Sequence, residues 1–174
     1  MSASRVPIGT RFFLTCSTMK MIKTSTPTPA SGVTDLMRNL CAEGSQESDH
    51  LRDALDHHLA SGGKRTRANT CLACADSLKI SRHDSIHLAT AVECVHNASL
   101  VQDDYQDRST LRRGCPSVWK AFDEHTALCL TDLLLSAAFT AVAGTSTPER
   151  TPELTRHLHK AVSKTLRGQM RDTS

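Results

Sequence analysis

Residues 81–108, SRHDSIHLATAVECVHNASLVQDDYQDR, carry the pattern that decides the fold. Ser81, followed three positions later by Asp84, resembles a capping box that opens a helix. Apolar side chains then recur at helical spacing, at Ile86, Ala89, Val92, Val95 and Leu100. Because this period places them on one face of a helix and not on alternate faces of a strand, we predict a long helix that ends near residue 108.

The flanking segments show the same helical period. We expect helices at about 34–43, 45–60, 64–79 and 124–143, a short helix near Pro116, and a last helix from about 150 to the end. Gly62-Gly63 and Gly144 with Pro148 are typical of the breaks between them. The sequence therefore predicts an all-α protein, with one domain over 35–174 after a linker at 26–32.

Charge and composition exclude two classes of function. The formal charge is +3 in 174 residues, and no Lys/Arg stripe is interleaved with aromatic residues, so we do not expect nucleic-acid binding. No stretch approaches the roughly 20 apolar residues of a membrane span, so no transmembrane segment is expected. The seven scattered cysteines favour reduced thiols and a cytoplasmic location. Cys71 and Cys74 form a lone C-x-x-C pair, which we interpret as core residues and not as a redox or zinc site.

Residues 1–34 differ from the rest of the chain. This segment contains four basic residues, many Ser and Thr, and no acidic residue. We expect a disordered leader or a start site placed too early, since Met19 and Met21 follow; an organellar transit peptide is the alternative.

Asp103 and Asp107 lie four residues apart, so on a helix they project from one face, together with His96 one to two turns earlier. Two adjacent carboxylates repel each other, and the repulsion is relieved by open water, by a nearby Lys or Arg, or by a divalent ion. Mg²⁺ typically takes one or two protein carboxylates and phosphate oxygens of a substrate. Arg112 and Arg113 supply planar donors matched to phosphate. The stretch therefore predicts a magnesium-bridged phosphate site, with a solvated charged surface as the alternative.

A second basic cluster, GGKRTR at 62–67, stands at the start of a predicted helix. Free backbone N–H groups at a helix N-terminus favour anions. Lys64 and Arg67 are three residues apart and share a face. An ordinary glycine-ended helix with surface charges remains the alternative for this motif taken alone.

In this order and spacing, GGKRTR, His96, DDYQD at 103–107 and RRGCP at 112–116 resemble the trans-isoprenyl diphosphate synthases, the polyprenyl synthetase family. Asp132 and the Gly168-Gln169-x-x-Asp172 segment add to the resemblance, which covers about 35–174. It implies an isoprenoid-synthase bundle of long helices around a deep cavity. It also implies that isopentenyl diphosphate is joined to an allylic diphosphate, whose C–O bond ionises with the help of Mg²⁺.

The resemblance implies a role for each motif residue. Asp103 and Asp107 would hold Mg²⁺ with Asp104 supporting, Arg112 would bind the allylic diphosphate, and isopentenyl diphosphate would be bound by Lys64, Arg67, His96 and Arg113. The residues five and four positions before the first aspartate, Ala98 and Ser99, are small. In family members with short products, bulky residues at these positions close the cavity. We therefore expect a geranylgeranyl (C20) or longer product.

The largest departure from the family pattern is a missing second aspartate-rich motif downstream of residue 172. We expect the N-terminal part of an ordinary synthase, with little or no turnover by this chain alone. One alternative is a non-catalytic subunit that pairs with a complete synthase, and another is a terpene cyclase fragment, for which GGKRTR would be unexpected. The resemblance also implies a possible homodimer or heteromer. A smaller departure is Asp123, which stands where the family usually has Gly.

Overall fold

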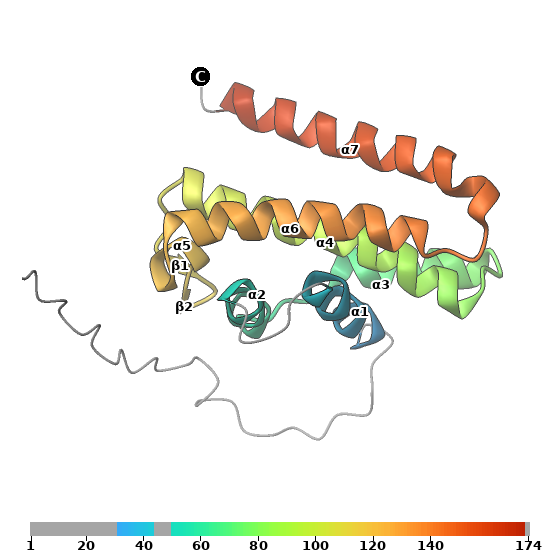
Figure 1. The fold of residues 1–174 in the computed structure, drawn as a ribbon, viewed down its shortest axis with the longest axis horizontal. Coiled ribbons are helices and arrows are strands. Elements are labelled where there is room, and N and C mark those ends of the chain that lie inside the picture. The colour runs from blue at the N-terminus through green and yellow to red at the C-terminus, as the bar shows by residue number, and fades with distance from the viewer. Residues whose placement is uncertain (1–30, 44–49, 173–174) are drawn as a thin grey trace, which may run out of the picture.

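The computed structural model describes residues 31–43 and 50–172, and it confirms the all-α class (Figure 1). The elements are α1 (Ser31–Ala42), α2 (His50–Ala60), α3 (Thr66–Ser77), α4 (Arg82–Gln106), β1 (Leu111–Arg112), β2 (Cys115–Pro116), α5 (Val118–Ala121), α6 (Glu124–Ala143), a 3₁₀ turn (Pro148–Arg150) and α7 (Thr151–Asp172). Helices α4 and α6 lie side by side through the middle, with α7 on one side of the pair and α1 and α2 on the other (Figure 1).

The core forms where α4 and α6 pack against each other. Alanines at the contact, including Ala98 on α4 and Ala138 on α6, are fully buried and let the two helices approach closely. Leu130 and Leu134 of α6 fill the space toward α1 and α2, with no exposed surface. Each fully buried leucine stabilises the fold by about 1.5–3 kcal/mol relative to an exposed one. This packing fixes the position of α4 in the core.

Side-chain caps define where the two central helices begin. Ser81 Oγ accepts from the Asp84 backbone N–H at 3.1 Å, which confirms the predicted start of α4. The Asp84 carboxylate in turn accepts from Ser146 N and Ser146 Oγ, each at 2.7 Å, and so ties α4 to the turn before α7. Asp123 Oδ1 accepts from Thr126 N at 2.6 Å, so this departure from the family pattern caps α6.

Several predicted boundaries were wrong by a few residues. Helix α1 begins at Ser31 and not at 34, α3 begins at Thr66 and not at 64, and α4 ends at Gln106 and not at 108. The expected leader covered residues 1–34; residues 1–30 and the expected start of the second helix at 45 lie outside the described residues, whereas residues 31–34 belong to α1 and are not a disordered leader.

A two-stranded hairpin was not predicted. Leu111 pairs with Pro116 and Arg112 pairs with Cys115, and Arg113-Gly114 form the turn. Both turn residues have positive φ, 53° and 80°, as in the tight turns whose twist matches that of paired strands. Pro116 lies in β2, and the short helix predicted near it is α5 (Val118–Ala121).

The premise behind one further expectation, that no stretch is long and apolar enough for a membrane span, and the interpretation of the cysteine pair both need correction. Helix α6 is long and apolar enough to cross a membrane by length and composition, although half of that stretch is buried inside the fold, as in a core helix. Cys71 packs against the small cluster around Val33, but Cys74 is exposed, so only one cysteine of the pair contributes to packing. Both are free thiols.

Candidate diphosphate site

The loop between α2 and α3 has an unusual backbone. Gly62 and Gly63 have φ of 80° and 148°, and Arg65, the N-cap of α3, has φ of 49°. Arg65 gives no side-chain cap to the helix, so the first N–H groups of α3 are left to a ligand or water. The loop thus leaves an uncapped helix N-terminus, where the helix dipole favours an anion.

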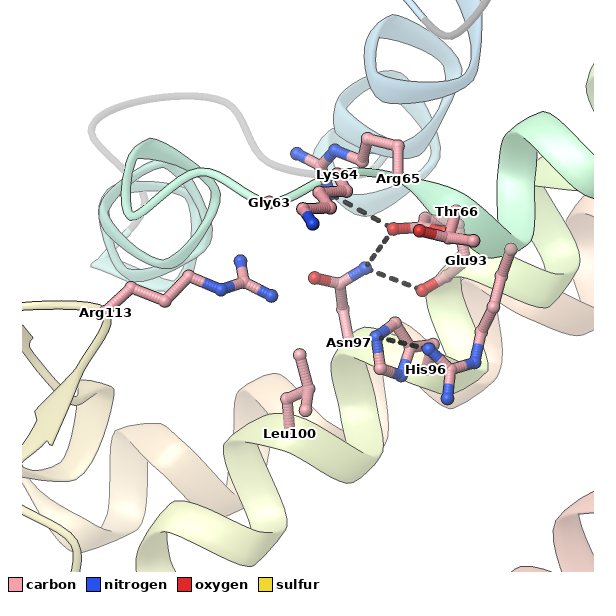
Figure 2. A pocket seen from close by; sticks show the side chains of 10 residues that line it. Gly63, Lys64, Arg65, Thr66, Glu93, His96, Asn97, Leu100 and Arg113 are labelled. Carbon is pink, nitrogen blue, oxygen red and sulfur yellow. Dashed lines mark hydrogen bonds and ion pairs between the residues drawn. The ribbon is translucent and has the colours of Figure 1, made fainter.

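This N-terminus opens into a cavity of about 550 Å³ (Figure 2). The lining comes from three parts of the chain: the loop and first turn of α3, one face of α4, and the tip of the hairpin. The lining residues are Gly63, Lys64, Arg65, Thr66, Arg67, Glu93, His96, Asn97, Leu100 and Arg113. All four residues predicted to bind isopentenyl diphosphate, Lys64, Arg67, His96 and Arg113, therefore line one cavity.

Arg113 reaches the cavity from the hairpin turn. Figure 2 shows its side chain extending toward the glycine loop. A Cβ atom at Gly63 would lie 2.6 Å from Arg113 Nη1, closer than such atoms pack. The guanidinium therefore occupies the space that the missing side chain leaves, and the positive φ of Gly63 makes any other residue there strained.

His96 is paired with Arg67 across the cavity wall, with 3.1 Å between His96 Nε2 and Arg67 Nη1. A guanidinium only donates, so Nε2 accepts and the ring proton lies on Nδ1. Burial lowers the pKa of His96 below its usual value, and the charge of Arg67 adds to the effect. His96 is therefore neutral near pH 7 and offers a ligand a donor without a charge.

Sequence reasoning missed the carboxylate in this cavity. Glu93 is 3% exposed and forms an ion pair with Arg65, with 3.3 Å between Oε1 and Nη1. Asn97, one helical turn later on α4, bonds to the backbone oxygen of Glu93 at 2.7 Å. The sequence did contain a signal for this network. Glu93 and Asn97 follow Ala89 at intervals of four residues, so these polar side chains lie on the same buried face of the helix as Ala89.

The aspartate-rich end of α4 is tied to the hairpin. Arg112 Nε and Nη2 donate to Asp104 Oδ2 and Oδ1 at 2.6 and 2.7 Å, a bidentate pair with Asp104 buried. This hydrogen bonding raises the pKa of the Arg112 guanidinium above its usual value. Asp104 therefore holds the hairpin through Arg112. The remaining guanidinium nitrogen of Arg112, Nη1, takes no part in this pair.

Asp103 and Asp107 lie beyond the cavity lining, at the last turn of α4. Asp103 Oδ1 accepts from Gln169 Nε2 of α7 at 2.5 Å, and Asp107 is the exposed C-cap. Within the described part of the chain no group of three or more His, Cys, Asp or Glu could enclose a metal. Two carboxylates one turn apart suit an ion that also takes oxygens from phosphate and water, as Mg²⁺ does.

Comparisons with known proteins identify the family. The sequence model of the polyprenyl synthetases matches residues 48–174. The chain belongs to the polyprenyl synthetase family. A probable farnesyl diphosphate synthase of Bradyrhizobium diazoefficiens is 39% identical over 131 residues, and a geranylgeranyl pyrophosphate synthase of Geoglobus acetivorans is 38% identical over 122 residues. These alignments cover 74% and 70% of this chain, and 39% and 36% of the relatives.

Solved structures of the same family share the fold. The geranylgeranyl pyrophosphate synthetase of Geoglobus acetivorans matches with a TM-score of 0.75 at 32% identity, covering 83% of this chain and 47% of that one. The enzyme of Pyrococcus horikoshii matches with a TM-score of 0.74 at 33% identity, covering 83% and 44%. The chain therefore spans less than half the length of these polyprenyl synthetases.

The two positions that the family resemblance relates to product length are neighbours on α4. Ala98 is buried in the core between α4 and α6. Ser99 lines a narrow groove between α4, α6 and α7, and its hydroxyl bonds to His96 O at 2.8 Å. Both side chains therefore line this groove in the arrangement of the polyprenyl synthetase helices.

Proposed function

We propose that the cavity binds isopentenyl diphosphate and that the chain serves the condensation of this substrate with an allylic diphosphate. The observation that supports the proposal is the convergence of Lys64, Arg67 and Arg113 on the uncapped N-terminus of α3. These cations come from segments up to 49 positions apart in the chain, and only the fold brings them to one cavity.

Charge in the cavity suits a diphosphate monoester. The lining has four basic side chains and one carboxylate, an excess of three positive charges with His96 neutral. A diphosphate monoester carries about three negative charges near neutral pH, since its terminal phosphate pKa is close to 6. Arginine forks and a helix N-terminus both present several donors to such an anion.

We propose Mg²⁺ at Asp103 and Asp107 for the allylic partner. The ion would stabilise the charge that develops on the departing diphosphate. Asp103 reaches this role by exchanging its contact with Gln169, and Asp107 is already exposed to solvent. Asp104 holds Arg112 at the same end of α4, where Nη1 can donate to the allylic diphosphate. The substrates would thus lie in adjacent sites along α4.

The product class stays a proposal. Relatives of this chain carry both farnesyl and geranylgeranyl names. The small side chain of Ser99 beside the groove under α7 favours a product of C20 or longer.

Isothermal titration calorimetry with isopentenyl diphosphate tests the cavity assignment. We expect Lys64→Ala to weaken binding by about tenfold, the value of one charge-assisted contact. Lys160→Ala, which removes an equal charge from an exposed position on α7, is the matched control and should bind as the wild type does. Equal affinity of all three proteins would mean that GGKRTR is an ordinary charged surface.

A further inference from the structure

A buried network forms part of the wall of the diphosphate cavity, and the roles assigned to the other cavity residues do not account for it. Its centre is Glu93, whose side chain is 4% exposed. Oε1 pairs with Arg65, whereas Oε2 is buried and has no hydrogen-bond partner among the described residues. A buried carboxylate with an unsatisfied oxygen is costly for folding, and it lies where an anion is expected to bind. Neither packing nor direct anion binding explains a negative charge at this position.

The ion pair with Arg65 accounts for a carboxylate at this position. Arg65 is the N-cap of α3 and has left-handed backbone angles, φ 49° and ψ 35°, which are unfavourable for a residue with a side chain. The other two basic residues of the motif, Lys64 and Arg67, are exposed at the cavity. The side chain of Arg65 is 18% exposed and bonds inward to Glu93. The ion pair thus secures the backbone at the one residue from which the loop turns into the helix.

Two further residues, Asn97 and His58, help to hold the Glu93 carboxylate in place. Asn97 Nδ2 donates to Glu93 O at 2.7 Å and to Oε1 at 3.5 Å, and Asn97 Oδ1 lies 3.0 Å from His58 Nε2. Burial lowers the pKa of His58 to about 4, so the ring is neutral. With the Asn97 amide nitrogen directed at Glu93, its oxygen accepts from His58. Figure 2 shows the Asn97 bonds to Glu93.

We propose that Glu93 is a positioning residue for diphosphate binding: through Arg65 it holds the 62–67 loop in the shape that presents Lys64, Arg67 and the α3 N-terminus to the anion. Glu93 itself does not contact the diphosphate. This inference rests on the proposed function of the cavity, and it adds a residue outside the GGKRTR, DDYQD and RRGCP motifs.

The sign of the effect separates positioning from direct electrostatics. Glu93→Gln removes a negative charge beside an anion site and keeps the shape of the side chain. Electrostatics alone predicts tighter binding of an anion, whereas loss of positioning predicts weaker binding. We expect the 174-residue chain to bind inorganic pyrophosphate about tenfold more weakly by calorimetry after this change, with the helical circular dichroism unchanged.

A double-mutant cycle tests the route through Arg65. In an Arg65→Gln background, Glu93→Gln should cause no further loss, because the partner is already absent. Glu93→Asp keeps the negative charge but shortens the side chain, so the carboxylate moves away from Arg65 and binding should also weaken. This variant replaces Glu93→Gln in the test if Glu93→Gln does not fold. Unchanged or tighter pyrophosphate binding by the folded variants, or additive losses in the cycle, would overturn the inference.

Lys64→Ala in the same titrations separates the inference from the proposed function. If Lys64→Ala weakens pyrophosphate binding and the Glu93 variants do not, the cavity assignment stands and the positioning role fails. If Lys64→Ala has no effect, the proposed function fails first.

Discussion

At the scale of single residues, Gly63 has the most specific requirement. Its φ of 148° is unsuited to a side chain, and Arg113 occupies the space that a Cβ atom would need. A side chain here would displace the guanidinium from the cavity or distort the loop. The glycine therefore makes room for a cation supplied by a distant hairpin.

We predict that Gly63→Ala weakens pyrophosphate binding by about tenfold, since it strains the loop and displaces one arginine contact. Gly168→Ala is the matched control, because a Cβ atom there meets nothing within 4 Å and the site is a helix interior. The control should bind normally and gain about 0.5–1 kcal/mol of stability. Normal binding by Gly63→Ala would show that Arg113 is not confined by the loop.

Four cavity residues could be predicted from the sequence because the order and spacing of their motifs resemble those of the polyprenyl synthetase family. Glu93 could not, because its negative charge opposes anion binding and its partner Arg65 resembles one more anion-binding cation. Arg112 was predicted to bind substrate, and the structure shows that two of its nitrogens bond to Asp104. Which charges of a motif pair with each other depends on the fold and not on spacing.

His58 makes the fold sensitive to acid. Its pKa falls from 6.5 to about 4 through burial, so below about pH 6.5 the unfolded chain takes up a proton that the folded chain excludes. Stability is therefore full above this range and declines as the pH falls toward 4. We predict a contribution of His58 to this decline of about 2 kcal/mol between pH 7 and pH 5, measured by urea unfolding.

The matched comparison uses two histidine variants. His58→Gln keeps a donor for Asn97 and should show a smaller loss between these two pH values than the wild type. His159→Gln, at an exposed position on α7, should keep the full loss. Equal losses in all three proteins would mean that His58 titrates normally in the fold.

At the scale of elements, the hairpin and the end of α4 form one unit. Asp104 and Arg112 join them through two hydrogen bonds, with Asp104 at 4% and Arg112 at 22% side-chain exposure. The same hairpin carries Arg113 into the cavity. Loosening this pair should therefore affect both the stability and the basic cavity.

We predict that Asp104→Asn lowers the free energy of unfolding by about 1–3 kcal/mol, because a partly buried arginine loses its charged partner. Urea denaturation measures the loss. Glu124→Gln, which weakens the exposed pair between Arg108 and Glu124, is the control and should lower the stability less than Asp104→Asn does. Equal costs would show that burial of the Asp104 pair adds nothing.

The central helices could be predicted well because their apolar patterns continue over many residues. Helix α4 has 25 residues and the apolar helix α6 has 20. The ends of both helices lie within two residues of the predicted ends. Strands of two residues are too short to show a period, and Arg113 gives no sign that it adopts positive φ. The start of α3 shifted to Thr66 because the left-handed Arg65 continues the loop.

At the scale of the whole molecule, α4 organises the site. One face of this helix lines the basic cavity through Glu93, His96 and Leu100, and its end presents the aspartates. Helix α6 supports it from behind, and α7 reaches Asp103 through Gln169. The central claim is therefore that one helix carries two adjacent sites, one for a diphosphate held by cations and one for a diphosphate held through a metal.

The most direct test of this claim is calorimetric titration of the chain with inorganic pyrophosphate, with and without Mg²⁺. We predict that Mg²⁺ strengthens pyrophosphate binding by about tenfold or more, since the ion bridges carboxylate and phosphate oxygens. Asp103→Ala should abolish this gain, and Asp76→Ala, at an exposed position on α3, should keep it. Binding that is indifferent to Mg²⁺, or a gain that survives Asp103→Ala, would contradict the account.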